Sequence, residues 1–215
     1  MSGVLIVTGT DTGIGKTVAA AGLAAALDAT YWKPIQAGTQ EGTDSATARA
    51  LGVPPARIAP EAYRLALPAS PHLAARAEGL ALDPARLALP PARPLIVEGA
   101  GGLMVPINDT PPWLMIDQFA VWGVPVLLVA RTALGTINHS LLSVQALKAR
   151  GIPVAGLLFV GPPHADNEAV IPALAGVPHL GRLPLLDPLD AATLRAAMDA
   201  QVDLAAIRAA IGTAA

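Results

Sequence analysis

The chain has 215 residues, a formal net charge of −2 and 53% hydrophobic residues. This length fits one ordinary α/β domain, and the apolar content supports a substantial core, which excludes global disorder. Cysteine is absent, which excludes disulfides, thiol nucleophiles and cysteine-ligated metal centres.

Composition also narrows the partners that we expect. The arginines are scattered singly, so the chain has no basic patch of the kind that binds nucleic acid. The longest purely apolar run spans only residues 18–27, whereas a membrane-spanning helix needs about 20 residues. The N-terminus has neither the basic region nor the small-residue cleavage site of a secretory signal. We therefore expect a cytoplasmic protein without nucleic-acid or membrane partners.

Short apolar runs alternate with helical patterns along the chain. The patterns predict strands over 3–8, 30–35, 94–98, 124–130 and 153–160. They predict helices over 17–29, 43–51, 72–78, 113–122, 136–150, 165–174 and 191–211, with Gly52 ending the second. This alternation predicts an α/β fold in which helices cover both faces of a doubly wound, mainly parallel sheet, as one domain over residues 1–215.

A glycine-rich loop follows the first predicted strand. Residues 8–17 read TGTDTGIGKT, and a helix is predicted to begin at the Lys-Thr pair. Strand, glycine loop and helix in this order indicate a phosphate-binding loop, in which Lys16 reaches the β- and γ-phosphates and Thr17 supplies a hydroxyl to Mg²⁺. The strict pattern has glycine where this chain has Thr10, and Gly9 lies one residue early.

Lysine is scarce, with only Lys16, Lys33 and Lys148 in the chain. Lys33 follows a predicted strand, and ligands of open α/β sheets gather at the carboxyl ends of strands. Glu98 also ends an apolar strand, where its charge needs a partner, and Mg²⁺ suits that place beside a phosphate loop. Asp44 is either a further oxygen ligand or a cap or first-turn acid of a helix.

Other catalytic patterns are missing. The chain has neither a G-x-S-x-G elbow nor an H-E-x-x-H motif. The histidines, His72, His139, His164 and His179, lie far apart in sequence and are expected to be structural or solvent-facing. The residues alone thus predict a magnesium-dependent site for nucleotide phosphates.

Five segments carry a resemblance to a known family. TGTDTGIGKT, YWKPIQAG, PASPHLAA, VEGAGGLMVPI and ALGTINHSLLS occur in this order, and together they resemble dethiobiotin synthetase from about residue 4 to about residue 186. The resemblance implies a P-loop homodimer that uses ATP and Mg²⁺ to join CO₂ to 7,8-diaminopelargonate and close the ureido ring. It also implies a carbamate that is phosphorylated to a carbamic–phosphoric anhydride and attacked by the second amine.

The same resemblance implies roles for individual residues. It makes Lys33 the lysine that bridges the carbamate and the γ-phosphate, with Lys16 and Thr12 as further catalytic residues. The residues assigned to the nucleotide and its metal are Gly13, Ile14, Gly15, Lys16, Thr17, Val18, Asp44, Glu98, Gly99, Ala100, Gly101 and Pro184, with Thr17, Asp44 and Glu98 as metal ligands. Those assigned to the diamine are Thr12, Lys33, Ala37, Gly101, Gly135 and Asn138, with the helix start at 135–138 supplied by the partner subunit.

Two positions depart from the family pattern. Ala37 stands where the family often has Ser or Thr, which removes a hydroxyl contact to the substrate. Val160 stands near the place of an asparagine that reads adenine, and valine cannot form those hydrogen bonds. Since Pro184 is then the remaining candidate at the base, we expect relaxed selectivity among nucleoside triphosphates.

Three other interpretations fit parts of the pattern. Septum or DNA-partition ATPases have phosphate loops that resemble K-G-G-x-x-K, with a second lysine early in the loop, but no lysine precedes Lys16 in this chain. The C-terminal helix is also not a basic amphipathic helix of the kind that anchors such proteins to membranes. A glutamine-dependent cobyrinate-type amidoligase needs a glutaminase domain with a cysteine nucleophile, and the chain has no cysteine. An inactive nucleotide-binding module is disfavoured because both lysines, Thr17 and both carboxylates are retained.

Overall fold

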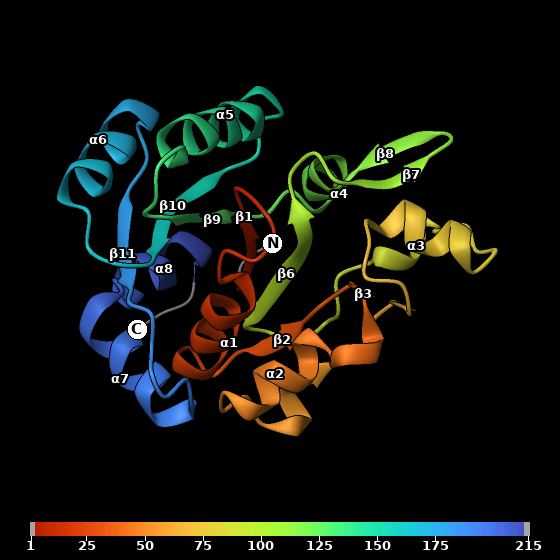
Figure 1. Ribbon diagram of the computed structural model, residues 1–215, viewed down its shortest axis with the longest axis horizontal. Coiled ribbons are helices and arrows are strands. Elements are labelled where there is room, and N and C mark those ends of the chain that lie inside the picture. The colour runs from red at the N-terminus through yellow and green to blue at the C-terminus, as the bar shows by residue number, and fades with distance from the viewer. Residues whose placement is uncertain (1–2, 213–215) are drawn as a thin grey trace.

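The computed structural model describes residues 3–212, with Glu41 described by its backbone only. Within these residues, seven strands form one sheet in the order β11-β10-β9-β1-β6-β2-β4, and every neighbouring pair is parallel (Figure 1). The chain first passes from β1 to β2 and β4, then returns through β6 between β1 and β2, and β9, β10 and β11 follow on the other side of β1. The predicted doubly wound α/β fold is confirmed.

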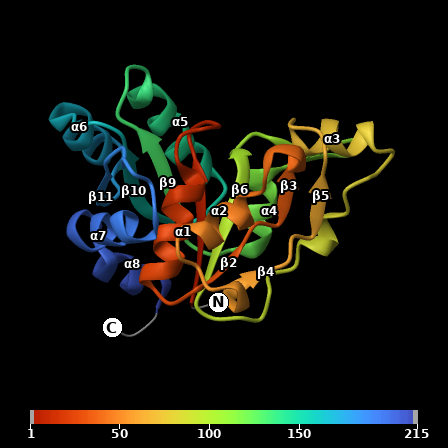
Figure 2. The same cartoon turned by 60° about the horizontal axis from the view of Figure 1, so that its bottom comes forward.

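The strands of the large sheet are β1 (Val4–Gly9), β2 (Thr30–Trp32), β4 (Ile58–Ala59), β6 (Leu95–Gly102), β9 (Val126–Arg131), β10 (Val154–Val160) and β11 (His179–Leu183). A parallel pair is formed by β3 (Ile35–Ala37) and β5 (Tyr63–Leu65), and an antiparallel hairpin by β7 (Pro106–Asp109) and β8 (Pro112–Leu114). Both short pairs contact α3, the hairpin through β7 (Figure 1) and the parallel pair through β3 and β5 (Figure 2).

The helices are α1 (Lys16–Ala26), α2 (Asp44–Ala50), α3 (Pro71–Ala77), α4 (Met115–Trp122), α5 (Thr136–Ala149), α6 (Ala165–Ala175), α7 (Ala191–Gln201) and α8 (Leu204–Ile211), with short 3₁₀ turns at Thr39–Glu41, Pro55–Arg57 and Pro84–Leu87. Figures 1 and 2 show them on both sides of the sheet. None of the helices within residues 3–212 is long and apolar enough to cross a membrane.

Alternation along the strands divides the core between the two faces of the sheet. Leu5 and Val7 of β1 join the core beneath α1, α2 and α7, whereas Val4 and Ile6 join the core beneath α4. All four side chains are fully buried. A strand covered on both faces is continuously apolar, which is why the sequence pattern identified β1.

The predicted strand over 30–35 is wrong in one respect, because it is two strands in different sheets. β2 ends at Trp32, and β3 begins only at Ile35 and pairs with β5. Pro34 lies at the break, where proline has no N–H to donate to a neighbouring strand. The break leaves Lys33 at the carboxyl end of β2.

The predicted helix over 191–211 is also wrong, because α7 and α8 are separate helices. Val202 forms an antiparallel bridge with Gly181 of β11, and the Asp203 N–H donates to the Leu180 carbonyl at 2.9 Å. The Asp203 carboxylate then caps α8 by accepting from the Ala206 N–H at 2.8 Å. Asp203 was thus an N-cap signal inside the apparently continuous pattern.

Smaller differences concern the ends of elements and several short strands. The helix predicted over 17–29 ends at Ala26, and Asp28 has a left-handed φ of 57°. The helix predicted over 113–122 begins at Met115, because Trp113 pairs with Asn108 in the β7–β8 hairpin. The strand pattern did not identify β4, β5, β7, β8 or β11, most of which are four residues or shorter.

We expect Gly181→Ala to lower the free energy of unfolding by about 3 kcal/mol, because a β-carbon there would lie 2.0 Å from the Gln201 carbonyl oxygen at a φ of 118°. Gly151→Ala is the matched control, since Gly151 also has a positive φ, 66°, but open space around it, and should cost about 1 kcal/mol. Urea unfolding followed by circular dichroism measures both. Equal losses would contradict the close approach of β11 to the end of α7.

Candidate active site

The loop between β1 and α1 is held in shape by glycines. Gly13 and Gly15 have left-handed φ values of 69° and 94°, which L side chains rarely adopt. A β-carbon on Gly9 would lie 2.4 Å from Ile14 Cδ1 and 3.1 Å from Lys16 Cδ. Glycine at position 9 therefore lets the returning loop and the stem of Lys16 pack against β1. The position that has no room for a β-carbon is thus 9 and not 10, where the strict pattern has glycine and this chain has Thr10.

Lys16 is buried at the start of α1. Its Nζ donates to the Asp11 carbonyl at 2.7 Å, which folds the side chain back over the loop. Burial, together with the nearby charge of Lys33, lowers the pKa of Lys16 to about 8. Asp11 also accepts from the Thr12 N–H at 2.7 Å and pairs with Arg131 at 3.0 Å. Asp11 is thus a turn residue of the loop with an added ion pair.

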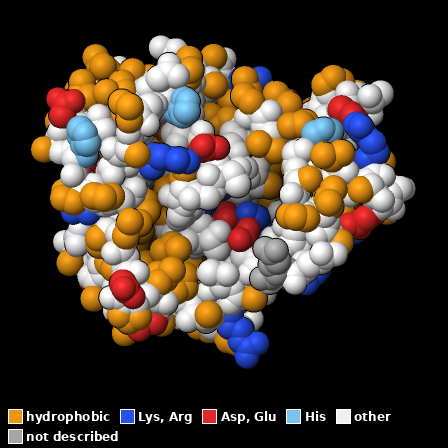
Figure 3. Space-filling model, viewed as in Figure 1, with side chains coloured by type: hydrophobic (Ala, Val, Ile, Leu, Met, Phe, Trp, Pro, Cys, Tyr) orange, Lys and Arg blue, Asp and Glu red, His pale blue; other side chains and the backbone are white. Residues whose placement is uncertain are grey.

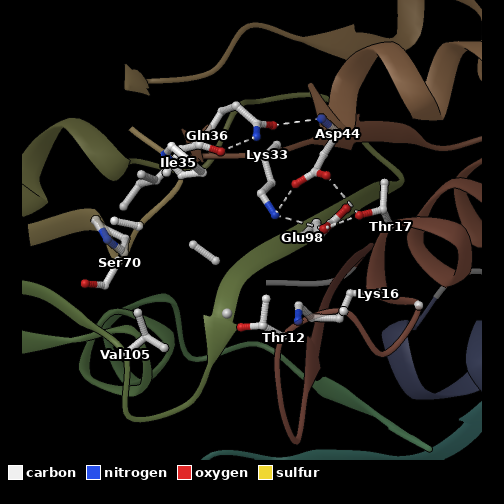
Figure 4. Close-up of a pocket in the computed structure, with 18 of the residues that line it drawn as sticks. Thr12, Lys16, Thr17, Lys33, Ile35, Gln36, Asp44, Ser70, Glu98 and Val105 are labelled. Atoms are coloured by element: carbon white, nitrogen blue, oxygen red, sulfur yellow. Dashed lines mark hydrogen bonds and ion pairs between the residues drawn. The ribbon is translucent and has the colours of Figure 1, made fainter. Parts of the chain in front are cut away.

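A lysine bound by two carboxylates lies beside the loop (Figure 4). Lys33 Nζ lies 2.6 Å from Asp44 Oδ2 and 2.8 Å from Glu98 Oε1, and it donates to the Gly99 carbonyl at 3.2 Å. The Thr17 hydroxyl lies 2.9 Å from Glu98 Oε1 and 3.1 Å from Asp44 Oδ1. Residues from β2, α2, β6 and α1 therefore meet at one point.

The electrostatics of this cluster follow from its burial. Glu98 is 1% exposed and Lys33 is 5% exposed. Burial by itself would lower the pKa of Lys33, but the charges of Glu98 and Asp44 outweigh it, so the pKa of Lys33 is raised. Lys33 therefore stays an ammonium ion at neutral pH. The Tyr31 hydroxyl donates to Glu98 Oε2 at 2.6 Å, and burial together with Glu98 raises the pKa of Tyr31 well above its usual value.

Local structure explains why these side chains meet. Lys33 directly follows β2, and Glu98 is the fourth residue of β6, which continues to Gly102 instead of ending at Glu98 as predicted. The two strands are neighbours and pair in register up to Trp32 and Val97. Thr43 caps α2 by accepting from the Ala46 N–H at 3.1 Å, so Asp44 is the first helical residue rather than the cap. The Asp44 N–H donates to Gln36 Oε1 at 2.8 Å, which ties the start of α2 to β3.

A cavity of about 690 Å³ opens over this cluster. Its floor includes Lys16, Thr17, Lys33, Asp44 and Glu98, and Figure 3 shows charged side chains meeting in a hollow of this face. The other lining residues come from the loop, β3, the segment before α3, and β6 with its following turn: Thr12, Gly13, Gly15, Val18, Ile35, Gln36, Ala37, Pro68, Ala69, Ser70, Pro71, Ala100, Gly101 and Val105.

A second cavity of about 400 Å³ lies on the other side of the loop. Gly13, Gly15 and Val18 line both cavities, so the two share the loop as a wall. Ile14 of the loop also lines the second cavity. Its remaining residues are mostly apolar and lie at or after the carboxyl ends of β9, β10 and β11: Arg131, Thr132, Ala133, Val160, Gly161, Pro162, Leu183, Pro184, Leu185, Leu186 and Leu189. Arg131 and Thr132 carry the only side-chain hydrogen-bonding groups among these lining residues.

Most residues singled out from the sequence line one of the two cavities, and three do not. Gly99 is buried beneath the first cavity, where it contributes its carbonyl to Lys33 and where a β-carbon would lie 2.9 Å from Phe119. Gly135 and Asn138 are exposed at the start of α5 and line neither cavity within this one chain. Lys148, the third lysine, donates to the Ala175 carbonyl at 2.7 Å and so satisfies the end of α6.

Sequence reasoning missed several residues of the site. Tyr31 and Gln36 bond to the cluster, Val105 lines the first cavity, and Arg131 pairs with the loop. Tyr31 carried a usable signal, since it precedes Lys33 by two residues and therefore shares its side of an extended strand. Residues 68–71, which form one wall of the first cavity, lie within the PASPHLAA segment, to which the family resemblance assigns no role.

The donor set also fits a hard cation. One hydroxyl and two carboxylates are oxygen ligands of the type that Mg²⁺ takes, and the Lys33 ammonium already lies between the two carboxylates as a bound positive charge. Within residues 3–212, no group of three or more His, Asp or Glu residues is arranged to hold a metal, so this set depends on two carboxylates and one hydroxyl. The sheet, the loop and this cluster together define a P-loop nucleotide-binding protein.

Comparisons with known proteins narrow that class. A family model described as an AAA domain matches residues 4–193. Proteins named ATP-dependent dethiobiotin synthetase BioD are similar over most of the chain: 58% identity for that of Afipia carboxidovorans (92% of this chain, 94% of the relative), 59% for Rhodopseudomonas palustris strain BisB18 (90% and 92%) and 56% for Rhizorhabdus wittichii (93% and 96%). The chain belongs to the ATP-dependent dethiobiotin synthetase family, a family of ligases that form dethiobiotin in biotin biosynthesis.

A solved structure supports the fold alone. The ParA family ATPase of Chlorobium tepidum TLS superimposes with a TM-score of 0.58, covering 98% of this chain and 96% of that chain at 12% identity. The predicted dethiobiotin synthetase family is confirmed, and the partition-ATPase interpretation is wrong as a family assignment, although the two share the architecture.

Gly9→Ala should weaken nucleotide binding roughly 10- to 100-fold, because the added methyl group displaces Ile14 and the stem of Lys16. Thr10→Gly restores the strict loop pattern and should change affinity by no more than about twofold, since Thr10 does not fill the constrained position. Calorimetric titration with β,γ-methylene-ATP measures both variants. A large gain in affinity from Thr10→Gly would contradict our assignment of the structural role to Gly9.

Proposed function

We propose that this chain carboxylates 7,8-diaminopelargonate with CO₂ and closes the ureido ring at the expense of ATP, with the reaction taking place in the first cavity. The observation that carries the proposal is the placement of Lys16 and Lys33, two buried lysines, on the floor of a cavity that shares the phosphate loop with a second, apolar cavity. A nucleotide base in the second cavity can extend its phosphates over the loop toward both lysines.

Mg²⁺ is the metal we propose, held by Thr17, Asp44 and Glu98. Bound there, it would neutralise phosphate charge beside the reacting carbamate. The support is the all-oxygen donor set and the cation-binding geometry already taken up by Lys33 between Asp44 and Glu98. Lys33 and Mg²⁺ would therefore bind the same two carboxylates, those of Asp44 and Glu98.

Charge repulsion is the obstacle that this site must overcome. An anionic carbamate has to approach an anionic γ-phosphate, and buried lysines offset that repulsion while excluding water. Lys16 holds phosphate oxygens from the loop, and Lys33 binds the carbamate and γ-phosphate from the opposite wall. An ammonium on a flexible stem can follow the phosphoryl group as it transfers, which a planar guanidinium does less well.

The reaction then proceeds in three balanced steps. One amine attacks CO₂ and loses a proton to give the carbamate. A carbamate oxygen attacks the γ-phosphorus and ADP leaves, which gives the mixed anhydride. The second amine attacks the carbonyl carbon of the anhydride and loses a proton, phosphate leaves, and the ring closes. Thr12 lines the cavity where the amines are placed, and the backbone of Ala100 and Gly101 borders the diamine.

The far end of the substrate needs an anion site. We assign its carboxylate to the start of α5, at Gly135 and Asn138 of the partner subunit in a homodimer, because N–H groups at a helix N-terminus suit an anion. Support comes from the exposure of this helix start and of Leu134 beside it, which is fully exposed. We treat residues 1–215 as one functional domain, since the seven-stranded sheet includes both β1 and β11, the first and last strands. The cytoplasmic location stays a prediction.

Base recognition is proposed to be loose. Pro184 and Val160 line the second cavity, and Val160 packs over the loop, where a β-carbon on Gly15 would lie 3.0 Å from its Cγ1. The nearby amide of Asn167 is buried and donates to the Thr132 carbonyl at 2.9 Å, so it is already engaged. A wall of Leu, Pro and Val selects by shape rather than by hydrogen bonds.

Incubation with ATP, Mg²⁺, ¹³C-bicarbonate and 7,8-diaminopelargonate should release ADP and give labelled dethiobiotin, detected by mass spectrometry. Lys33→Ala should stay folded in Mg²⁺, because a divalent cation can take the place of the ammonium between Asp44 and Glu98, yet turn over about 100-fold or more slowly.

Lys148→Ala is the matched control for Lys33→Ala, because it removes the lysine that lies outside both cavities and should keep normal turnover. The absence of diamine-dependent ADP release in the unaltered protein would overturn the proposed function. Full turnover in Lys33→Ala would remove Lys33 from the mechanism while leaving the overall reaction in place.

Values of kcat/KM for ATP, CTP and GTP should lie within about 100-fold of one another, because shape alone discriminates weakly. Val160→Asn should raise the preference for ATP, since it places an amide at the wall of the second cavity. Steady-state kinetics with each triphosphate measure both effects. A preference for ATP of several thousandfold in the unaltered protein would contradict loose recognition.

A further inference from the structure

Tyr31 lies directly behind the carboxylate cluster. It is the middle residue of β2, flanked by β6 and β4, with Ile96 and Ile58 as its register partners. Its side chain is fully buried and packs in the core beneath α1 and α2. Because Tyr31 and Lys33 are two residues apart at the end of one strand, both side chains extend to the same side of the sheet, where Glu98 lies.

The two residues divide the oxygens of Glu98 between them. The Tyr31 hydroxyl donates to Oε2 at 2.6 Å, while Lys33 and the Thr17 hydroxyl lie 2.8 and 2.9 Å from Oε1. Oε2 is thus held from the core side, and Oε1 faces the cavity. A carboxylate fixed in this way cannot rotate about its last bond without losing the bond to Tyr31.

The chemistry of a phenol suits this task. A second lysine at position 31 would neutralise Glu98 and weaken its attraction for a cation, whereas a neutral hydroxyl fixes one oxygen and leaves the charge in place. The chain's other tyrosine shows the ordinary alternative. Tyr63 also has a buried ring, but its hydroxyl bonds to the backbone of Asp83, accepting from the N–H at 2.8 Å, and touches no charged side chain through that oxygen.

We propose that Tyr31 is a positioning residue of the magnesium site, which holds Glu98 so that Oε1 would face the metal. The inference rests on the proposed role of Glu98 as a metal ligand. Partners that orient metal ligands are commonly worth 10- to 100-fold in metal affinity, although they never touch the metal.

Tyr31→Phe removes the hydroxyl and keeps the packing of the ring. We expect it to weaken Mn²⁺ binding about 10-fold, measured by electron paramagnetic resonance in the presence of β,γ-methylene-ATP. In turnover assays it should raise the apparent KM for Mg²⁺ by a similar factor, with a smaller change in kcat at saturating Mg²⁺. Tyr63→Phe is the matched control, since it deletes an equivalent buried hydroxyl away from the cluster, and it should bind Mn²⁺ as the unaltered protein does.

Glu98→Gln separates failure of this inference from failure of the metal site itself. Loss of Mn²⁺ binding in Glu98→Gln together with normal binding in Tyr31→Phe would overturn the role of Tyr31 and leave the metal site intact. Normal binding in Glu98→Gln would overturn the metal site, and the role of Tyr31 with it. Equal weakening in Tyr31→Phe and Tyr63→Phe would reduce Tyr31 to a general contribution to stability and also overturn the inference.

A second measurement needs no substitution at position 31. The chain contains only two tyrosines, so protein labelled with 3-fluorotyrosine gives two ¹⁹F signals, which Tyr63→Phe assigns. Added Mg²⁺ with β,γ-methylene-ATP should shift the Tyr31 signal, because its acceptor gains a metal on the other oxygen, and should leave the Tyr63 signal in place. An unmoved Tyr31 signal at saturating Mg²⁺ would overturn the inference.

Discussion

The buried charge of Glu98 constrains the rest of this site. A carboxylate at 1% exposure is unstable unless donors and an opposite charge surround it, and isolated burial of such an ion is far costlier than any single contact in a fold. Here Lys33 supplies the charge, and Thr17 and Tyr31 supply neutral donors. Because these partners come from β2 and α1, the bonds that they form with Glu98 also fix the position of the phosphate loop relative to the sheet.

The three lysines of the chain each have a distinct structural environment, and two of them lie at this site. Lys16 and Lys33 are both buried, although their environments move their pKa values in opposite directions: burial lowers that of Lys16, while Glu98 and Asp44 raise that of Lys33 against the effect of burial. Lys148 instead closes the end of α6 through the Ala175 carbonyl. Each lysine in the chain therefore has a defined partner, and most of the positive charge at the surface comes from arginine.

Sequence patterns predicted the sheet, the loop and the charged floor because these depend on local signals. Continuous apolar strands, the glycine loop and residues at strand ends such as Lys33 and Glu98 can all be located without tertiary information. Tyr31 and Gln36 could not, since their roles depend on which strand lies beside which. The break at Asp203 was missed because the helical pattern continues through it, and the N-cap signal of Asp203 becomes decisive only together with the pairing of Val202 with Gly181.

The two cavities are lined by different parts of the chain. Every residue that lines the first cavity lies between Thr12 and Val105, whereas apart from the loop and Val18 the second is lined by residues from Arg131 to Leu189. Only the loop region belongs to both. Under the proposed function, substitutions between Arg131 and Leu189 at the second cavity would alter which nucleotide is favoured and leave the residues that line the first cavity unchanged. Nucleotide preference and the groups proposed to act on the carbamate would then be encoded at separate positions of the chain.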